Sequence, residues 1–332
     1  AYGRRSIDIM SDSCRANVWL ASVDGKSHRP LLSSKKSYYS IRWSPDGSRL
    51  AYLSNEEGKP QLYVRWMDTG QTALVTNVTS NPSNITWSPD GKHIAFTMSV
   101  DAKEKPLDIK MPKKPDGAKW SPSFQYIPKA RYQADGRGIL EPAYTHIFIV
   151  PADGGTARQL TSGNYHHNGR LSFSPDSDKI YFSANRSDNW EYEPVEGDIF
   201  SVDMMGNIAQ LINDKGLESS PVVSPDGKHI AYARRDDEKV MYKNSYLYVM
   251  KSDGTDAQNL TKDIDNSVSN FHWKDNKHVY FQQSVRGLAQ VDVVSLSGSV
   301  KAVAKGLGGT TLGRPYVFGT YHAVGDVVAY TK

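Results

Sequence analysis

The stretch Trp43-Ser44-Pro45-Asp46-Gly47 decides the fold, because it returns along the chain at regular intervals. Close copies stand at residues 87–91, 173–177 and 223–227, and a degenerate copy at 273–277. Proline presets φ near −65° at a turn corner, aspartate bonds to the local backbone, and glycine accepts positive φ. Each copy therefore predicts a hairpin turn between two adjacent strands.

Strand-like segments follow every copy of this turn. Leu50-Ala51-Tyr52-Leu53 comes directly after the first copy, and Gln61-Leu62-Tyr63-Val64 leads through a second turn to residues 73–76. β-Branched and aromatic residues dominate these segments, as strands favour. A WD-like unit of four strands, repeated about every 45 residues, is typical of a propeller blade. The sequence thus predicts an all-β fold, a β-propeller of four-stranded antiparallel blades.

The spacing of the copies leaves two blade counts open. Counting back 44 residues from Trp43, the distance to Trp87, lands just before residue 1. A final copy is expected at 315–318 with 327–331. This arithmetic favours seven blades, the first and last incomplete. Alternatively, residues 315–331 join residues 17–32 in one shared blade, giving six blades and no loose edge.

One interval is about twice the others. Trp87 and Phe173 stand 86 residues apart, and the excess falls at about 101–143, which is rich in proline and lysine and lacks the repeat. We interpret residues 1–332 as a single propeller domain with an insertion there. The insertion is expected to form an ordered excursion on one face, because it contains five large anchors. These are Trp120, Phe124, Tyr126, Ile127 and Tyr132.

Composition narrows the function classes. With 40 basic and 36 acidic residues the net charge is +4, and no concentrated basic stripe predicts nucleic-acid binding. The one cysteine, Cys14, excludes an intrachain disulfide and cysteine-rich zinc sites. No apolar run predicts a membrane span. The nine histidines are scattered, so neither a metal nor a cofactor is expected. We expect a soluble protein, cytoplasmic or periplasmic, and the compartment is left open.

Beyond the repeat, several segments resemble one family. The stretches 111–120, 131–138 and 183–186 and the segment Gly313-Arg314-Pro315-Tyr316 are similar to the propeller of prolyl oligopeptidase-family serine peptidases, in the acylaminoacyl-peptidase-like branch. The resemblance covers essentially the whole chain. It implies an α/β-hydrolase domain following the propeller, where Ser, Asp and His catalyse acyl transfer.

The chain itself carries no such machinery. Its Gly-x-Ser is Gly25-Lys26-Ser27, and Arg29 stands where a nucleophile elbow needs glycine. We therefore expect no catalytic residue here and a hydrolase domain absent from this chain. The predicted function is a substrate-gating propeller whose partners are the hydrolase domain of its parent protein and short peptides. A free-standing binding propeller similar to the Tol-system scaffold is the alternative. A metal-dependent polysaccharide lyase is a third, less favoured because it needs converging histidines.

The segment 185–193 supplies the candidate substrate-binding residues. It lies between the second and third strands of a blade, where loops escape the packing of the repeat. Carboxylates can pair with a peptide amine, and arginine can bind a carboxylate or carbonyl. The candidates are Arg186, Trp190, Glu191 and Glu193, with Arg314 added from the family-like segment.

Overall fold

The computed structural model describes residues 1–102, 112–121, 127, 129–236, 240, 242–308 and 319–332. The predicted strand at 315–318 and the candidate Arg314 lie outside these residues. The described part of the chain consists of strands and turns. No helix in it is long and apolar enough to cross a membrane. The prediction of an all-β fold is confirmed.

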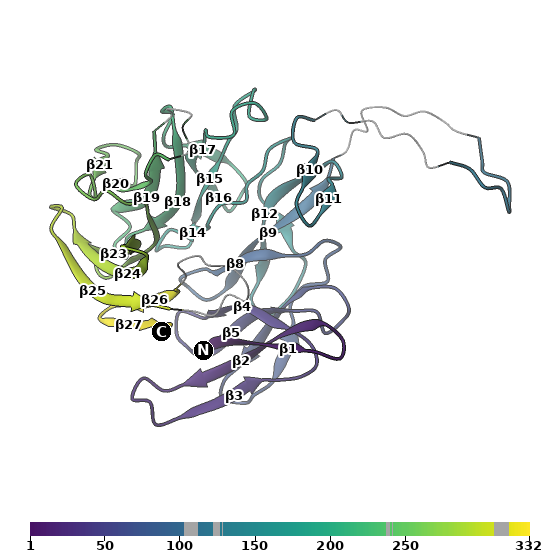
Figure 1. Ribbon diagram of the computed structural model, residues 1–332, viewed down its shortest axis with the longest axis horizontal. Coiled ribbons are helices and arrows are strands. Elements are labelled where there is room, and N and C mark those ends of the chain that lie inside the picture. The colour runs from purple at the N-terminus through teal and green to yellow at the C-terminus, as the bar shows by residue number, and fades with distance from the viewer. Residues whose placement is uncertain (103–111, 122–126, 128, 237–239, 241, 309–318) are drawn as a thin grey trace.

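Five antiparallel four-stranded sheets follow one another around a common centre (Figure 1). We number these blades 1 to 5 in chain order. Blade 1 is β4 (Tyr38–Trp43), β5 (Arg49–Ser54), β6 (Gln61–Trp66) and β7 (Thr72–Leu74); blade 2 is β8 (Ser83–Trp87), β9 (His93–Asp101), β12 (Ala143–Pro151) and β13 (Arg158–Gln159); blade 3 is β14 (Ser172–Phe173), β15 (Lys179–Ala184), β16 (Asp198–Asp203) and β17 (Ile208–Gln210). Blade 4 is β18 (Leu217–Val223), β19 (His229–Arg235), β20 (Tyr246–Lys251) and β21 (Gln258–Asn259), and blade 5 is β22 (Val268–Trp273), β23 (His278–Val285), β24 (Leu288–Ser295) and β25 (Val300–Leu307).

The repeated turn joins the first and second strands of a blade, as predicted. In the first copy Ser44 Oγ donates to Asp46 Oδ1 over 2.6 Å and accepts from the Arg49 amide over 2.9 Å. Gly47 has a φ of 71°, in the left-handed region that glycine tolerates. The same serine–aspartate bond recurs in the copies at 87–91, 173–177 and 223–227.

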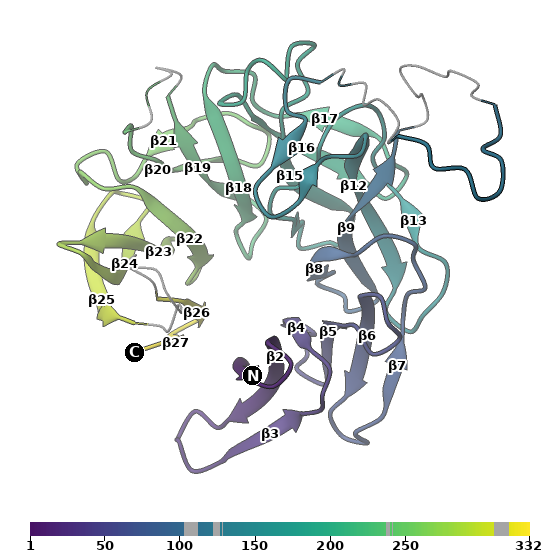
Figure 2. The same cartoon turned by 45° about the vertical axis from the view of Figure 1, so that its right-hand side comes forward.

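The two chain ends occupy the sixth position of the ring. The strands β1 (Tyr2–Asp8), β2 (Ser13–Ala21) and β3 (His28–Leu32) form one sheet, and β26 (Tyr321–Val324) with β27 (Val327–Tyr330) forms another. The first packs against blade 1 and the second against blade 5. The positive amino terminus lies close enough to His322 to contribute to lowering its pKa, after burial and the neighbouring arginines. Figure 2 shows both sheets at the open side of the ring.

This arrangement matches the alternative of six blades. Six strands stand innermost, namely β4, β8, β14, β18, β22 and β26. A seventh four-stranded blade is not seen among the described residues, so the main prediction of seven is not supported. Counting the repeat backwards suggested an extra blade before residue 17, and residues 2–8 do form a strand, β1. However, β1 does not belong to a separate blade, because it pairs with β2. It occupies the edge of β2 at which the six-blade alternative had placed the C-terminal residues 315–331. No ladder joins β1 to β27 within the described chain.

Cross-blade packing forms the core. Trp87 of blade 2 is 7% exposed and donates from its indole to the Arg42 carbonyl of blade 1 over 3.1 Å. Trp273 of blade 5 repeats this contact with the Val222 carbonyl of blade 4 over 2.8 Å. The large residue before the serine therefore points between blades, where burial of its ring stabilises one blade on the next.

The connections between strands lie on two opposite faces of the propeller, as the strand directions require. In an antiparallel blade the repeated turns lie at one face, and the links from second to third strand and from blade to blade lie at the other, which we call the loop face. The insertion leaves β9 and returns to β12 at the loop face, and contains the hairpin β10 (Gln133–Ala134) and β11 (Gly138–Ile139). The end of β27 reaches the same face, because Thr331 bonds to Thr320 and Gly308 in the preceding blade link.

Candidate functional site

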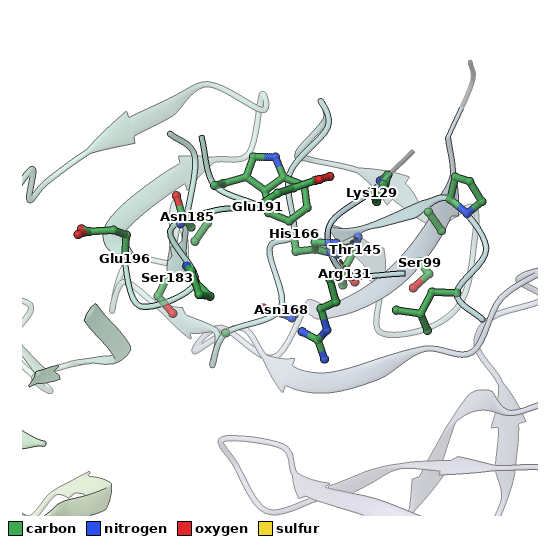
Figure 3. A pocket seen from close by; sticks show the side chains of 18 of the residues that line it. Ser99, Lys129, Arg131, Thr145, His166, Asn168, Ser183, Asn185, Glu191 and Glu196 are labelled. Carbon is green, nitrogen blue, oxygen red and sulfur yellow. Dashed lines mark hydrogen bonds between the residues drawn. The ribbon is translucent and has the colours of Figure 1, made fainter. Parts of the chain in front are cut away.

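A cavity of about 700 Å³ opens at the loop face between blades 2, 3 and 4. Its walls come from the inserted segment at 127 and 129–143, the blade link at 166–169, the loop at 183–197 and the start of β18 (Figure 3). All four are connections or strand ends, where side chains are free of the repeat's packing. The volume is in the range of small-ligand sites.

Aromatic and cationic groups form one wall. Trp190 packs edge-on against Tyr144 and His166, with ring centroids 6.2 and 5.4 Å away. The ammonium of Lys129 donates to the Tyr144 hydroxyl over 2.8 Å and lies 4.1 Å from that ring's centre. Burial, followed by the charges of Lys129 and Arg131, lowers the pKa of His166. His166 is therefore neutral near pH 7, and its Nδ1 accepts from the Thr145 amide over 3.3 Å.

Three carboxylates also belong to this region. Glu191 Oε2 accepts a long 3.4 Å hydrogen bond from the Ala130 amide, which links the loop to the insertion. Glu196 Oε2 accepts from the Gly216 amide over 3.2 Å. Glu218 is completely buried, and neither of its oxygens has a hydrogen-bond partner. Its nearest cation is Arg234, 3.3 Å away, and burial raises the pKa of Glu218 to about 7.

Arg186 has a different position from its predicted neighbours. Its guanidinium donates to His167 Nε2 over 2.6 Å and lies 4.7 Å from the Tyr165 ring centre. Burial lowers the pKa of His167 to about 3, so the ring is neutral and its Nδ1–H donates to the Thr145 carbonyl over 3.1 Å. Arg186 thus anchors a blade link below the cavity and does not line it.

The other predicted binding residues also differ in whether they line the cavity. Trp190 and Glu191 line the cavity. Glu193 is not among the lining residues, and its backbone carbonyl accepts from the Asn185 amide group over 2.8 Å. Arg314 lies outside the described residues. The structure therefore brings two of the five candidates together and surrounds them with groups that the sequence did not single out.

Those additional groups are Lys129, Arg131, His166 and Glu218. The first three come from irregular segments, whose paths no periodic pattern reveals. Glu218 did leave a signal, because it stands five residues before Val223 of the repeat. The equivalent residues before Trp43 and Trp273 are the buried Tyr38 and Val268. The carboxylate departs from these two buried residues, although the equivalent Asn168 of blade 3 is polar and exposed.

The chemistry of the cavity is that of a polar binding site. Glu191 lies beside Lys129 and Arg131 at the insertion, and Glu196 lies at the end of the loop at 183–197, so the cavity wall carries groups of both charges. Among the described residues no group of three or more His, Cys, Asp or Glu side chains is placed to hold a metal.

Comparisons with known proteins match this chain to two kinds of propeller. A family model described as the TolB beta propeller domain matches residues 9–111, and the dipeptidyl peptidase IV N-terminal region matches residues 121–233. The uncharacterized peptidase YuxL of Bacillus subtilis is 30% identical over 186 residues, which is 56% of this chain and 27% of that protein. The Tol-Pal system protein TolB of a Polaromonas species is 36% identical over 76 residues, 23% of this chain and 18% of that protein.

Solved structures show the same fold. The acylaminoacyl peptidase of Pyrococcus horikoshii superposes with a TM-score of 0.69 at 16% identity, covering 92% of this chain and 44% of that one. The propeller domain of the Trilobed protease from Pyrococcus furiosus gives 0.60 at 16% identity, covering 92% and 79%. The chain thus spans about a quarter of YuxL and under half of the acylaminoacyl peptidase.

The fold is a β-propeller, and two parts of the chain are similar to the TolB beta propeller domain and to the dipeptidyl peptidase IV N-terminal region. Within that class, the chain resembles the N-terminal propeller of prolyl oligopeptidase-family peptidases, with acylaminoacyl peptidases among its structural neighbours. The resemblance inferred from the sequence is confirmed.

Proposed function

We propose that this propeller is the substrate-gating domain of a serine peptidase that hydrolyses short peptides, of acylaminoacyl peptidase or dipeptidyl peptidase type. The observation that carries the proposal is the mixed-charge cavity at the loop face. Its carboxylates would pair with a peptide amine, and Lys129 and Arg131 with carbonyl or carboxylate oxygens. Trp190 offers an apolar surface for a side chain between them.

The position of β27 supports the same proposal. Because the chain beyond β27 emerges at the loop face, a hydrolase domain joined there would cover the cavity. Substrate would then meet Glu191 and Lys129 on its way to the catalytic serine. The dipeptidyl peptidase IV model matches residues 121–233, the span that holds most of the cavity wall.

A free-standing binding propeller is the second candidate. It is favoured by the TolB model over residues 9–111 and by the TolB relatives. In that case no catalytic domain follows, and the loop face would bind another protein directly. The two candidates differ in what the parent gene encodes.

The test uses the full-length parent protein. Labelling by a fluorophosphonate probe would show an active serine, and peptide hydrolysis would then be compared for free and N-acetylated substrates. Glu191→Gln should raise KM severalfold for peptides with a free amine and leave acetylated peptides unchanged, since only the former carry the ammonium. Glu57→Gln is the matched control, an exposed glutamate in the corresponding loop of blade 1. Equal effects of Glu191→Gln on both substrates would reject the role of the cavity, and an unlabelled parent protein would favour the binding propeller.

A further inference from the structure

Six side chains occupy one register position on the six innermost strands. Each pairs across its hairpin with the equivalent residue of the second strand, for example Arg42 with Ala51 and His322 with Ala329. Successive residues of a strand alternate between faces, so equivalent register positions share one orientation toward the axis. The six are Arg42, Thr86, Ser172, Val222, His272 and His322.

Arg170, just before β14, reaches the same region from blade 3. Its guanidinium donates to the Phe271 carbonyl of blade 5 over 2.7 Å, although blade 4 lies between these two blades in the ring. The side chain therefore passes blade 4 on the inner side of the ring. Phe271 directly precedes His272, so the guanidinium is brought beside that ring.

Four basic groups meet at this place, and we call Arg42, Arg170, His272 and His322 the axial basic cluster. The rings of His272 and His322 lie 4.9 Å apart. Burial, followed by Arg170, His322 and Arg42, lowers the pKa of His272 to about 3. Burial and then Arg42 and Arg170 lower the pKa of His322. The four groups are thus close enough to repel one another.

No carboxylate of the described chain balances these charges. Neither guanidinium takes part in an ion pair with a described residue, and each donates only to backbone carbonyls. Tyr321 is the other polar neighbour of His272, 5.2 Å from its ring, and its hydroxyl donates to the Asn270 carbonyl. Arg42 and His322 are nonetheless solvent-exposed, while Arg170 and His272 are half-buried. Water and small solutes can therefore reach a positive site enclosed by the inner strands.

We propose that the axial basic cluster binds the C-terminal carboxylate of a short peptide. Arginine presents two parallel N–H donors that match a carboxylate, and a site with two guanidinium groups and no acidic partner favours an anion. A terminal carboxylate is the one anionic group that every unblocked peptide carries. The choice of a peptide over other anions rests on the proposed function, whereas the anion site itself rests on the geometry alone.

The test is calorimetric titration of this chain with N-acetyl-Gly-Ala-Phe as the free acid and as its C-terminal amide. The acid should bind at least tenfold more tightly than the amide. Arg170→Gln and Arg42→Gln should each remove most of this preference. Arg29→Gln, an exposed arginine of the N-terminal sheet, is the matched control and should leave it intact.

Proton linkage gives an independent readout in the unmodified protein. Burial is the larger cause of the low histidine pKa values, but a bound anion offsets the part that comes from Arg42 and Arg170, so His272 and His322 should take up protons on binding at acidic pH. Titration in two buffers of different ionisation enthalpy measures that uptake. His272→Gln should reduce it even if an arginine variant fails to fold.

Several outcomes would overturn the proposal. Equal affinity for acid and amide would reject a carboxylate site. If acetate or phosphate binds as tightly as the peptide acid, the cluster is a site for any free anion and not for a peptide. If digalacturonate binds and the peptide does not, the ligand of the cluster is an acidic sugar. Failure of the proposed function is distinguishable, because an unlabelled parent protein would leave the acid-over-amide preference of this chain unaffected.

Discussion

At the scale of single residues, Glu218 shows how a site can depart from its scaffold. This position is buried in blades 1, 4 and 5, and a carboxylate placed there loses its hydration. Arg234 is close but also pairs with Asp214 over 2.8 Å, so it only partly compensates. The result is a carboxyl group that changes its charge near neutral pH, at the edge of the cavity.

Glu218→Gln should therefore change how stability depends on pH. Burial raises the folded-state pKa from 4.5 to about 7, so the protonated form is the one that folding favours. The stability associated with this group is complete below about pH 4.5 and is lost as pH rises to about 7. The variant should melt at the same temperature as the parent chain near pH 4.5. At pH 8 it should melt higher, by roughly 1–2 °C for each kcal/mol relieved.

Thermal melts of both proteins between pH 4.5 and 8 provide the measurement. Glu57→Gln is the control, because that side chain is exposed. A variant that melts lower than the parent chain at pH 8 would show that Glu218 acts mainly as the ionised partner of Arg234.

The residue scale is also where sequence-based prediction was weakest. Arg186 and Glu191 stand five residues apart in one loop, and their types suit peptide binding equally. Only the folded chain shows that Arg186 turns toward His167 while Glu191 lines the cavity. Residue type indicates what a group can bind, but the path of an irregular loop decides where the group points.

At the scale of elements, the hairpin turns were predictable because their conformation depends on local residues. Gly47, Gly91 and Gly227 all have φ near 70°, and Ser177 adopts 67° at the same place. The hydroxyl of Ser177 accepts from the Asp90 amide of blade 2 over 3.1 Å, which offsets part of the cost of that conformation. A hydrogen bond from a neighbouring blade can thus help a serine to adopt the positive φ for which the turn otherwise uses glycine.

Gly91→Val should lower the melting temperature. Gly91 has a φ of 69°, which costs a residue with a side chain roughly 1–2 kcal/mol. An added Cβ would also lie 3.3 Å from the guanidinium of Arg49, which bonds to the Gly91 carbonyl. Gly3→Val is the matched control, since Gly3 lies in β1 with no atom near its Cβ position. If the two variants melt alike in differential scanning calorimetry, the turn is not under the strain described.

Longer elements were harder to predict. The insertion was recognised from an excess of length, and its link to blade 3 through Glu191 and Ala130 has no periodic signal. The second strand of the last hairpin was expected at 327–331 and is β27 at Val327–Tyr330, whereas the strand expected at 315–318 lies outside the described residues. Spacing arithmetic locates a repeat but not the ends of its strands, which depend on the packing of neighbouring blades.

At the scale of the whole molecule, the propeller followed from the repeat, and the blade count did not. A repeat constrains each blade locally, while ring closure depends on how the two ends of the chain meet. β1 adds an edge to the N-terminal sheet and takes the place that a shared ladder would need. The choice between six and seven blades therefore needed the three-dimensional structure.

The chain alone should not hydrolyse peptides. We expect neither turnover of acylated or free aminoacyl chromogenic substrates nor labelling by a fluorophosphonate, because the sequence lacks a nucleophile elbow. The assay should include a known serine peptidase as positive control. Labelling that co-purifies with the 36.9 kDa species would contradict this expectation.

The meeting of the chain ends leaves one tryptophan in an unusual environment. Trp43 is 40% exposed, whereas its counterparts Trp87 and Trp273 are 7% and 9% exposed and bonded to the preceding blade. Within the described residues Trp43 has no such bond, since it faces the side where the ring closes. The fluorescence of Trp43 should therefore report on the packing where the ring closes. Its fluorescence, isolated by comparison with Trp43→Phe, should be quenched by acrylamide, and anything that tightens the ring should shield it and shift its emission to the blue.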